Sequence, residues 1–230
     1  MNNLKKKIEN LRFENFTILD KIFEKINVMY QSLFDFVYTF TIRKKITKNR
    51  HLYFKSNWYE SRRRSVTALT KEKNTIEWIN TFRKNSNFLD VGAHMGIYSL
   101  YAAKLKNCNV IAVEPCLANL SNLNFNVVNN NLEKKILICP FSISNKNKID
   151  KFYVSISSGK NKLLDLGAGF PTKPLNDRGK FIKNSYPHLT NLSTIDELYK
   201  NYGPFNYIKI DTDSNELEIL KGASNCFSDR

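Results

Sequence analysis

The sequence predicts an α/β protein in which a parallel sheet carries helices on both faces and a helical extension precedes it. Beyond residue 75, short apolar runs alternate with stretches of helical periodicity, the pattern of parallel strands joined by helices. The first glycine or proline of the chain is Gly92, and their absence before it favours helix in the N-terminal third. With 230 residues, 42% of them hydrophobic, the chain can form one globular domain plus an extension.

Residues 1–50 are predicted to form the helical extension, and residues 51–230 the main domain. Apolar residues of the extension recur in steps of three and four, interrupted once at Asn15, which places them on one face of one or two helices. This face predicts docking, on the main domain or on a second copy of the chain, or else contact with a membrane surface. Its members are Leu4, Ile8, Leu11, Ile18, Ile22, Ile26, Met29, Leu33, Phe36 and Phe40.

The membrane alternative depends on the segment from Ile26 to Ile42, whose single charge is Asp35. The segment has too many polar residues to cross a bilayer, and residues 1–15 lack the apolar core of a signal peptide. We therefore expect a cytoplasmic protein that contacts membranes at most peripherally. The basic residues that follow would suit an anionic interface; they are Arg43, Lys44, Lys45, Lys48 and Arg50.

The net charge of +15 is unevenly distributed along the chain. Residues 1–75 carry 17 basic and 7 acidic side chains, and residues 76–230 carry 19 and 14, so the two parts hold +10 and +5. Nucleic acid is disfavoured as a partner because most of this excess precedes the predicted active face. The four cysteines are widely spaced without a CxxC pair, which predicts neither a zinc site nor a disulfide framework.

Strands and helices of the main domain follow from the apolar runs and from their flanking glycines and caps. Ser193 or Thr194 is expected to cap the third helix, and Gly222 to end the fourth. The strands are predicted at Asn87–Val91, Asn109–Val113, Lys135–Cys139 and Tyr207–Ile210, and the helices at Ile97–Lys106, Leu117–Asn130, Thr194–Tyr199 and Glu216–Lys221.

The ends of the first two strands predict a nucleoside site, since ligands of open parallel sheets bind beyond the carboxyl ends of the strands. The first strand ends in Asp90-Val-Gly-Ala-His-Met-Gly96, where Gly92 allows a tight turn and Asp90 offers an acceptor for an ammonium or hydroxyl group. Glu114 ends the second strand 24 residues after Asp90, where such folds place the acid that holds ribose hydroxyls. Two glycines instead of the three of a dinucleotide loop favour S-adenosylmethionine, which has no phosphates.

A second glycine-rich segment, Leu164 to Gly169, is predicted not to bind a cofactor. Pro171 and Pro174 follow it and forbid the helix that such a loop needs. We interpret the surrounding region, Ser155 to His188, as a long insertion that is either a substrate lid or a disordered loop, with His188 on its surface.

Three segments resemble the FkbM family of S-adenosylmethionine-dependent methyltransferases, whose members show DVGANIG followed by IDVEGxE and LxGA. They are Phe88-Leu-Asp-Val-Gly-Ala-His-Met-Gly-Ile-Tyr-Ser-Leu-Tyr101, Val113-Glu-Pro115, and Ile208-Lys-Ile-Asp-Thr-Asp-Ser-Asn-Glu216 with Leu220-Lys-Gly-Ala223. The resemblance implies a class I, Rossmann-like methyltransferase fold and O-methylation of a hydroxyl on a glycan or small metabolite. The cofactor residues it implies are Asp90, Gly92, Ala93, His94, Gly96, Glu114 and Ser142, of which Ser142 would lie near adenine.

Asp211 would end the fourth strand beside the methyl-donor and acceptor groups. Asp211, Asp213 and Glu216 are the candidate catalytic residues, because repulsion among crowded carboxylates would raise the pKa of at least one toward that of a useful base. The alternative is that Glu216 caps the next helix and Asp213 faces water. No histidine joins these acids, so no metal site is predicted.

The chain departs from the family pattern at two places. Ser214 replaces the glycine of IDVEG, which could shift that loop if the position needs a positive φ. The chain also stops soon after the fourth strand, whereas the family's sheet needs about three more strands, so we expect a fragment, a natural truncation or a fold completed by a partner.

Two other functions stay open. One is nucleic-acid methylation, prompted by the charge, although the sequence lacks an Asn-Pro-Pro-Tyr strand end. Arg62, Arg63 and Arg64 could steer an anionic acceptor or simply form a solvated face. The other is an inactive, truncated methyltransferase fold that serves as an interaction protein.

Overall fold

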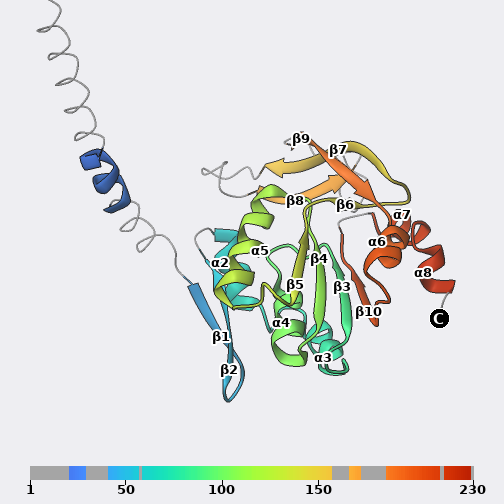
Figure 1. Ribbon diagram of the computed structural model, residues 1–230, viewed down its shortest axis with the longest axis horizontal. Helices are drawn as coiled ribbons and strands as arrows, with labels where there is room; N and C mark the ends of the chain where they lie inside the picture. Colours follow the sequence, from blue (N-terminus) through green and yellow to red (C-terminus); the bar gives the residue numbers. More distant parts are fainter. Residues whose placement is uncertain are drawn as a thin grey trace, which may run out of the picture. The chain divides into compact units, whose positions relative to one another are not determined.

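A computed structural model describes residues 21–29, 41–56, 59–156, 166–171, 185–212 and 215–228 (Figure 1). The chain divides into two compact units, Met1–Phe40 and Thr41–Arg230. In the first unit, residues 21–29 are helical, as predicted, and all of them are exposed. The remaining predicted helix of that unit lies outside the described residues.

The second unit is built on a parallel sheet with the strand order β10-β3-β4-β5. Three of these strands have the predicted bounds, and the fourth begins one residue late: β3 Asn87–Val91, β4 Asn109–Val113, β10 Tyr207–Ile210 and β5 Ile136–Cys139. Their sequences are short apolar runs because most of their side chains are buried. The predicted α/β class with a parallel sheet is confirmed.

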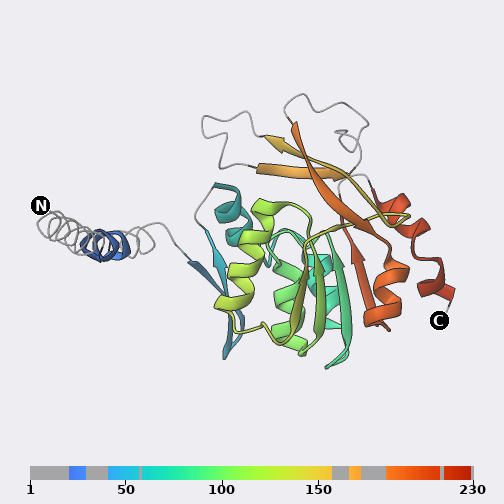
Figure 2. The same cartoon turned by 45° about the horizontal axis from the view of Figure 1, so that its top comes forward.

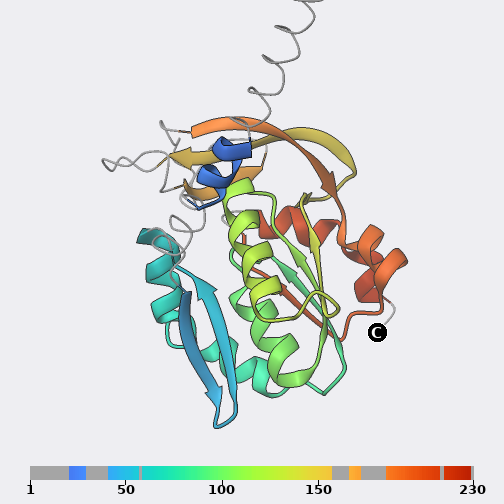
Figure 3. The ribbon, with the colours of Figure 1, turned by 60° about the vertical axis from the view of Figure 1, so that its left-hand side comes forward.

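Helices cover both faces of this sheet, as predicted (Figures 1 and 3). One face packs Phe88, Val110 and Ala112 against apolar residues from α3, α4 and α5, and the other packs Leu89 and Val91 against residues from α6, α7 and α8. The bounds of these helices are α3 Lys73–Asn80, α4 Ile97–Lys106, α5 Leu117–Asn129, α6 Ile195–Tyr202, α7 Glu216–Lys221 and α8 Ser224–Ser228.

The predicted helix caps are also present. Thr194 is the N-cap of α6, and its side chain accepts a hydrogen bond from the backbone N–H of Glu197. Gly222 is the C-cap of α7. Helix α6 continues to Tyr202, three residues beyond its predicted end.

A second sheet, β6-β9-β7-β8, was not predicted. It begins at β6 (Ser142–Ile143), three residues after the end of β5, and therefore lies at the carboxyl end of the parallel strands (Figure 2). Of the two alternatives for the insertion Ser155 to His188, a disordered loop is wrong where the structure describes it, because residues 155–156, 166–171 and 185–188 lie in strands. Antiparallel pairing brings together β7 Lys148–Ile156, β8 Leu166–Pro171 and β9 Ser185–Ser193.

A β-hairpin precedes helix α2 (Tyr59–Thr67). The prediction of helix is therefore wrong for the last part of the N-terminal extension. Strands β1 (Thr41–Thr47) and β2 (Arg50–Lys55) pair antiparallel, so residues 41–50 are not helical and the predicted boundary at residue 50 falls inside the hairpin. Exposure alternates along β1 with a period of two, whereas the steps of three and four further upstream suggested helix. Lys48-Asn49 forms the turn without a glycine, which left the hairpin without its usual sequence signal.

No helix within the described residues is long and apolar enough to cross a membrane.

Candidate functional site

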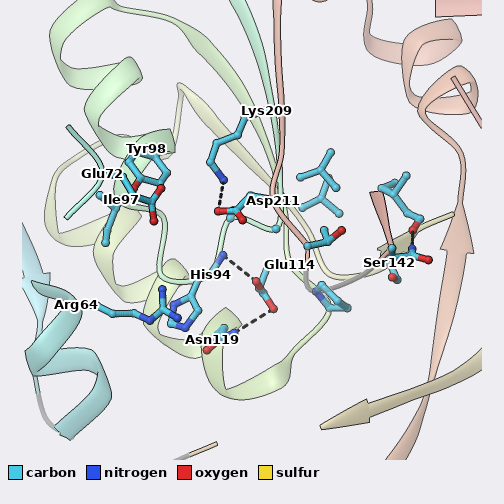
Figure 4. Close-up of a pocket in the computed structure, with 18 of the residues that line it drawn as sticks. Arg64, Glu72, His94, Ile97, Tyr98, Glu114, Asn119, Ser142, Lys209 and Asp211 are labelled. Carbon is cyan, nitrogen blue, oxygen red and sulfur yellow. Dashed lines mark hydrogen bonds and ion pairs between the residues drawn. The ribbon is translucent and has the colours of Figure 1, made fainter. Parts of the chain in front are cut away.

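A pocket of about 220 Å³ opens at the carboxyl ends of the parallel strands (Figure 4). Its walls come from the loop after β3, the end of β4, the start of β6, the segment after β10, and helix α2 with the turn that follows it. Of the predicted site residues, it gathers Gly92, Ala93, His94, Glu114, Ser142 and Asp211. Asp90, Gly96 and Glu216 lie beside the pocket and do not line it.

The loop after β3 has the backbone that its glycines predict. Gly92 and Gly96 have φ of +81° and +84°, and His94 between them also has a positive φ, of +53°. A Cβ atom built on Gly92 would lie 2.0 Å from the carbonyl oxygen of Asp211. Gly92 is therefore required by close packing against the chain after β10, in addition to the tight turn.

His94 is held as a neutral ring. Its Nδ1 accepts a hydrogen bond from the backbone N–H of Met95 at 2.8 Å, an arrangement that places any ring proton on Nε2. Burial, followed by the nearby charges of Arg64, Lys71 and Arg63, lowers the pKa of His94 to about 3. The ring therefore does not act as a cation near neutral pH.

Glu114 is a buried acceptor at the end of β4, with 5% of its surface exposed. Its Oε1 accepts hydrogen bonds from the backbone N–H of Cys116 at 2.9 Å and from Asn119 Nδ2 at 3.2 Å. Its Oε2 accepts one from the backbone N–H of His94 at 2.8 Å. Burial raises the pKa of Glu114, and these three donors oppose that shift. The carboxylate is fixed, and Oε2 keeps a lone pair for a further donor.

Asp90 is completely buried beneath the glycine loop. Its Oδ2 accepts a hydrogen bond from Ser99 Oγ at 2.6 Å, and its Oδ1 lies 3.7 Å from Lys209 Nζ without a hydrogen-bond partner. Lys209 faces Asp90 because the two are register partners in β10 and β3. The ammonium of Lys209 also lies 2.9 Å from Asp211 Oδ2 and 5.1 Å from the centre of the Tyr98 ring.

Lys209 is a buried pocket residue that sequence reasoning missed. It lines the pocket, is only 9% exposed, and joins two carboxylates that the sequence places 121 residues apart. Its position in the apolar run Tyr207–Ile210, where a buried cation needs an anionic partner, is the signal that could have found it.

The candidate catalytic carboxylates have separate partners. Asp211 is 61% exposed and pairs with Lys209, whereas Glu216 Oε1 accepts hydrogen bonds from the backbone N–H and side-chain hydroxyl of Thr212. Asp211 and Glu216 therefore each interact mainly with a cation or a hydrogen-bond donor, and not with each other. Asp213 and Ser214 lie outside the described residues, so the roles assigned to Asp213, Asp211 and Glu216 stay predictions.

The second sheet forms the side of the pocket at Ser142. Ser142 and Ile143 line it from β6, and Phe152 lines it from β7. His188, expected on a surface loop, instead lies in β9, where its ring centre is 5.2 Å from that of Phe152. The second glycine-rich segment, Leu164 to Gly169, is described from residue 166 onward, and that part lies in strand β8. It therefore does not form a loop before a helix, in agreement with the prediction.

The opposite side of the pocket is basic. Arg64 and Lys71 line it together with Glu72, and Tyr98 lies beside Glu72 (Figure 4). Burial and a hydrogen bond to Glu72 raise the pKa of Tyr98. The expectation that the basic excess lies away from the active face is therefore wrong in part, because α2 packs at the pocket and brings Arg64 to it.

Within the part of the chain that the structure describes, no cluster of three or more histidine, cysteine or acidic side chains is arranged to hold a metal ion. The prediction that no metal is used stays a prediction.

Comparison with known proteins identifies the family of this chain. The model of the methyltransferase FkbM domain matches residues 90–230, more than half of the chain. None of the curated proteins matches.

Similar solved structures include a SAM-dependent methyltransferase from Agrobacterium tumefaciens, at 18% identity and a TM-score of 0.33, over 44% of this chain and 32% of that one. TYW2 of P. horikoshii in complex with MeSAdo is similar at 17% identity and a TM-score of 0.32, over 46% of this chain and 39% of that one. Precorrin-6y C5,15-methyltransferase from Geobacter metallireducens is similar at 17% identity and a TM-score of 0.27, over 30% of this chain and 36% of that one. The chain spans less than two fifths of the length of each of these proteins.

The parallel sheet, its glycine loop and the family match define the class of protein as S-adenosylmethionine-dependent methyltransferases. Within that class, the chain belongs to the FkbM methyltransferase family.

Proposed function

We propose that this chain binds S-adenosylmethionine in the pocket and transfers its methyl group to a hydroxyl of a glycan or small metabolite. The observation that carries the proposal is that one pocket gathers the glycine loop, a fixed buried acceptor at Glu114 and an accessible carboxylate at Asp211. Family membership supports the reaction class.

The pocket residues suit the parts of this cofactor. Glu114 Oε2 can accept from a ribose hydroxyl, and Ser142 can contact the adenine edge. Asp211 is the exposed acceptor available to the methionyl ammonium or to the substrate, because Asp90 is buried and already faces Lys209. When bound, S-adenosylmethionine supplies an electrophilic methyl group on a sulfonium.

The protein's own contribution is mainly positioning, since methyl transfer is an in-line displacement. Asp211 would hold the acceptor hydroxyl, with its carboxylate oriented by the ammonium of Lys209 at 2.9 Å. Asp213 or Glu216 would assist removal of the hydroxyl proton.

Calorimetric titration with S-adenosylhomocysteine tests the cofactor assignment. Glu114→Gln should weaken binding by about 1.5–3 kcal/mol, the value of a hydrogen bond to a charged group. Glu133→Gln removes an exposed carboxylate outside this pocket and is the matched control. Unchanged affinity in Glu114→Gln, or binding of NAD in place of S-adenosylhomocysteine, would refute the assignment.

Radiolabelled S-adenosylmethionine tests the acceptor class. It is offered with the protein to a lysate that is then separated into RNA, protein, lipid and glycan fractions. We expect label in glycan or small molecules and a strong decrease with Asp211→Asn. Undiminished labelling by this variant would contradict the role of Asp211.

Methylation of a nucleic acid is the second candidate, because Arg64 and Lys71 bring positive charge to the pocket. In the same experiment, label in the RNA fraction that Arg64→Gln abolishes would favour it over a glycan or small metabolite.

A further inference from the structure

The hairpin β1–β2 presents one basic face to solvent. Cross-strand pairing of Arg43 with Tyr53, Lys45 with His51, and Thr41 with Lys55 puts these six residues on the same face. Arg43, Lys45 and Tyr53 are exposed, and the sequence from residue 41 to residue 55 has no acidic residue. We call this set of six residues the basic face.

The other face of the hairpin fixes it to the domain (Figure 3). Leu52 and Phe54 are completely buried in the core shared with α4 and α5. Side chains of α5 and of its C-cap also bond the outer edge of β2: Asn126 Oδ1 accepts from the N–H of Lys55, and Asn130 Oδ1 accepts from that of Tyr53. The basic face is therefore a surface of defined orientation on the domain.

The charges of this face lack anionic neighbours within the hairpin. Arg43 lies 2.9 Å from Nε2 of His51, an uncharged partner at neutral pH. Desolvation, then the positive charges of Arg43 and Lys45, lowers the pKa of His51, so the two cations account for the smaller part of this shift. Charge complementarity thus calls for an anionic partner.

The helix at residues 21–29 adds an apolar contact surface. Ile22, Phe23, Ile26 and Met29 are 49%, 67%, 42% and 63% exposed, and their spacing places them on one side of the helix. Along the chain, residues 30–40 connect this helix directly to the basic hairpin.

We propose that the basic face of the hairpin binds the headgroups of an anionic phospholipid surface while the apolar side of helix 21–29 inserts among its acyl chains. Peripheral attachment usually needs two such signals, one apolar and one electrostatic, and this chain has both in neighbouring segments. An exposed aromatic within the basic face, Tyr53, suits the boundary between headgroups and acyl chains. Nucleic acid would account for the basic face alone and would leave the apolar helix without a role.

Vesicle co-sedimentation of the full chain tests the attachment without any methylation assay. Wild-type protein should bind vesicles of phosphatidylcholine containing about one third phosphatidylglycerol and not vesicles of phosphatidylcholine alone. Raising the ionic strength from about 0.1 to about 1 M should release most of it, because the Debye length falls from about 10 to about 3 Å.

Substitutions separate the two contacts. The triple variant R43Q/K45Q/K48Q neutralises two cations of the basic face and the exposed lysine of the adjoining turn. It should bind about 100-fold more weakly, at roughly tenfold or less per lost charge. K84Q/K134Q/K146Q removes the same charge from exposed sites elsewhere on the domain and should keep near wild-type affinity. The variant I22S/F23S/I26S should also lose binding, with the domain's unfolding unchanged.

Four results would overturn the proposal. One is equal binding to both kinds of vesicle. Another is an equal loss of vesicle affinity in R43Q/K45Q/K48Q and in K84Q/K134Q/K146Q. A third is unchanged vesicle binding by I22S/F23S/I26S with loss of a dimer, which would assign the helix to self-association. The fourth is a hairpin variant that loses affinity for a single-stranded RNA but keeps its affinity for vesicles.

Discussion

The ends of β4 and β10 each carry a carboxylate into the pocket, but the two are held in different ways. Glu114 after β4 is 5% exposed and is bonded by two backbone N–H groups and one amide side chain. Asp211 after β10 is 61% exposed and pairs with a lysine that it shares with Asp90. Backbone donors cannot leave Glu114, whereas the lysine side chain can follow Asp211 or release it.

The comparison indicates that the carboxylates at the two strand ends have different roles. A fixed, desolvated acceptor suits a ligand part that always binds in the same way, and an accessible carboxylate suits groups that exchange during turnover. We therefore expect substitutions around Glu114 and Lys209 to affect folding strongly and substitutions of Asp211 to affect it little.

Lys209→Met should have the largest effect on stability. It leaves the completely buried Asp90 without its cation, and removal of one partner of a buried ion pair costs about 3–5 kcal/mol. Urea denaturation measures the loss. If Lys209→Met destabilises no more than Asp211→Asn, the lysine serves only the exposed carboxylate and the contrast between the two sites fails.

Glu114→Ala should cost about 3 kcal/mol of unfolding free energy. The substitution leaves three N–H donors without an acceptor, and each buried donor without an acceptor costs about 1–3 kcal/mol. Water that enters the space can bond some of these donors and reduce the total cost. Denaturation of this variant beside Glu133→Ala, an exposed control, isolates the effect. A loss equal to that of the control would show that the network around Glu114 is not structural.

His94→Asn should reduce the dependence of stability on pH. In the wild type, the folded pKa of about 3 lies below the ordinary value of 6.5, so unfolded chains take up a proton that folded chains do not. Unfolding free energy therefore falls as the pH falls from 6.5 toward 3, by about 2 kcal/mol at pH 5. Denaturation at pH 7 and pH 5 should show this extra loss in the wild type and not in His94→Asn; parallel losses would disprove it.

Asp211→Asn should change the unfolding free energy least, by less than about 1 kcal/mol, because its ion pair is largely exposed. Labelling of the acceptor should nevertheless decrease strongly. A variant that is destabilised as much as Glu114→Ala, with normal labelling, would reverse the proposed roles of the two carboxylates.

The parallel sheet could be predicted nearly to the residue because its signals are local. Asn87–Val91 and Asn109–Val113 are apolar runs that end at a glycine loop and at Glu114-Pro115, and both are strands with the predicted bounds. The motif residues after them reach one pocket because parallel strands end at the same edge.

What could not be predicted depends on pairing between distant segments. Strands β7 and β9 are stabilised by each other across a long connection, and Ile149 and Leu189 on them are largely exposed, so no buried run marks them. The pairing of Lys209 with Asp90 likewise follows from the register of β10 on β3, which local composition does not encode.

The contact between Gly92 and the carbonyl of Asp211 limits how the pocket can deform. A methyl group on Gly92 would collide with that carbonyl, so the loop after β3 and the segment after β10 pack in direct backbone contact. The backbone N–H of Asp211 also donates a hydrogen bond to the carbonyl of Val91 at 3.1 Å, which ties the two segments together. The side walls of the pocket come from other elements, from α2 on one side and from Phe152 of β7 on the other.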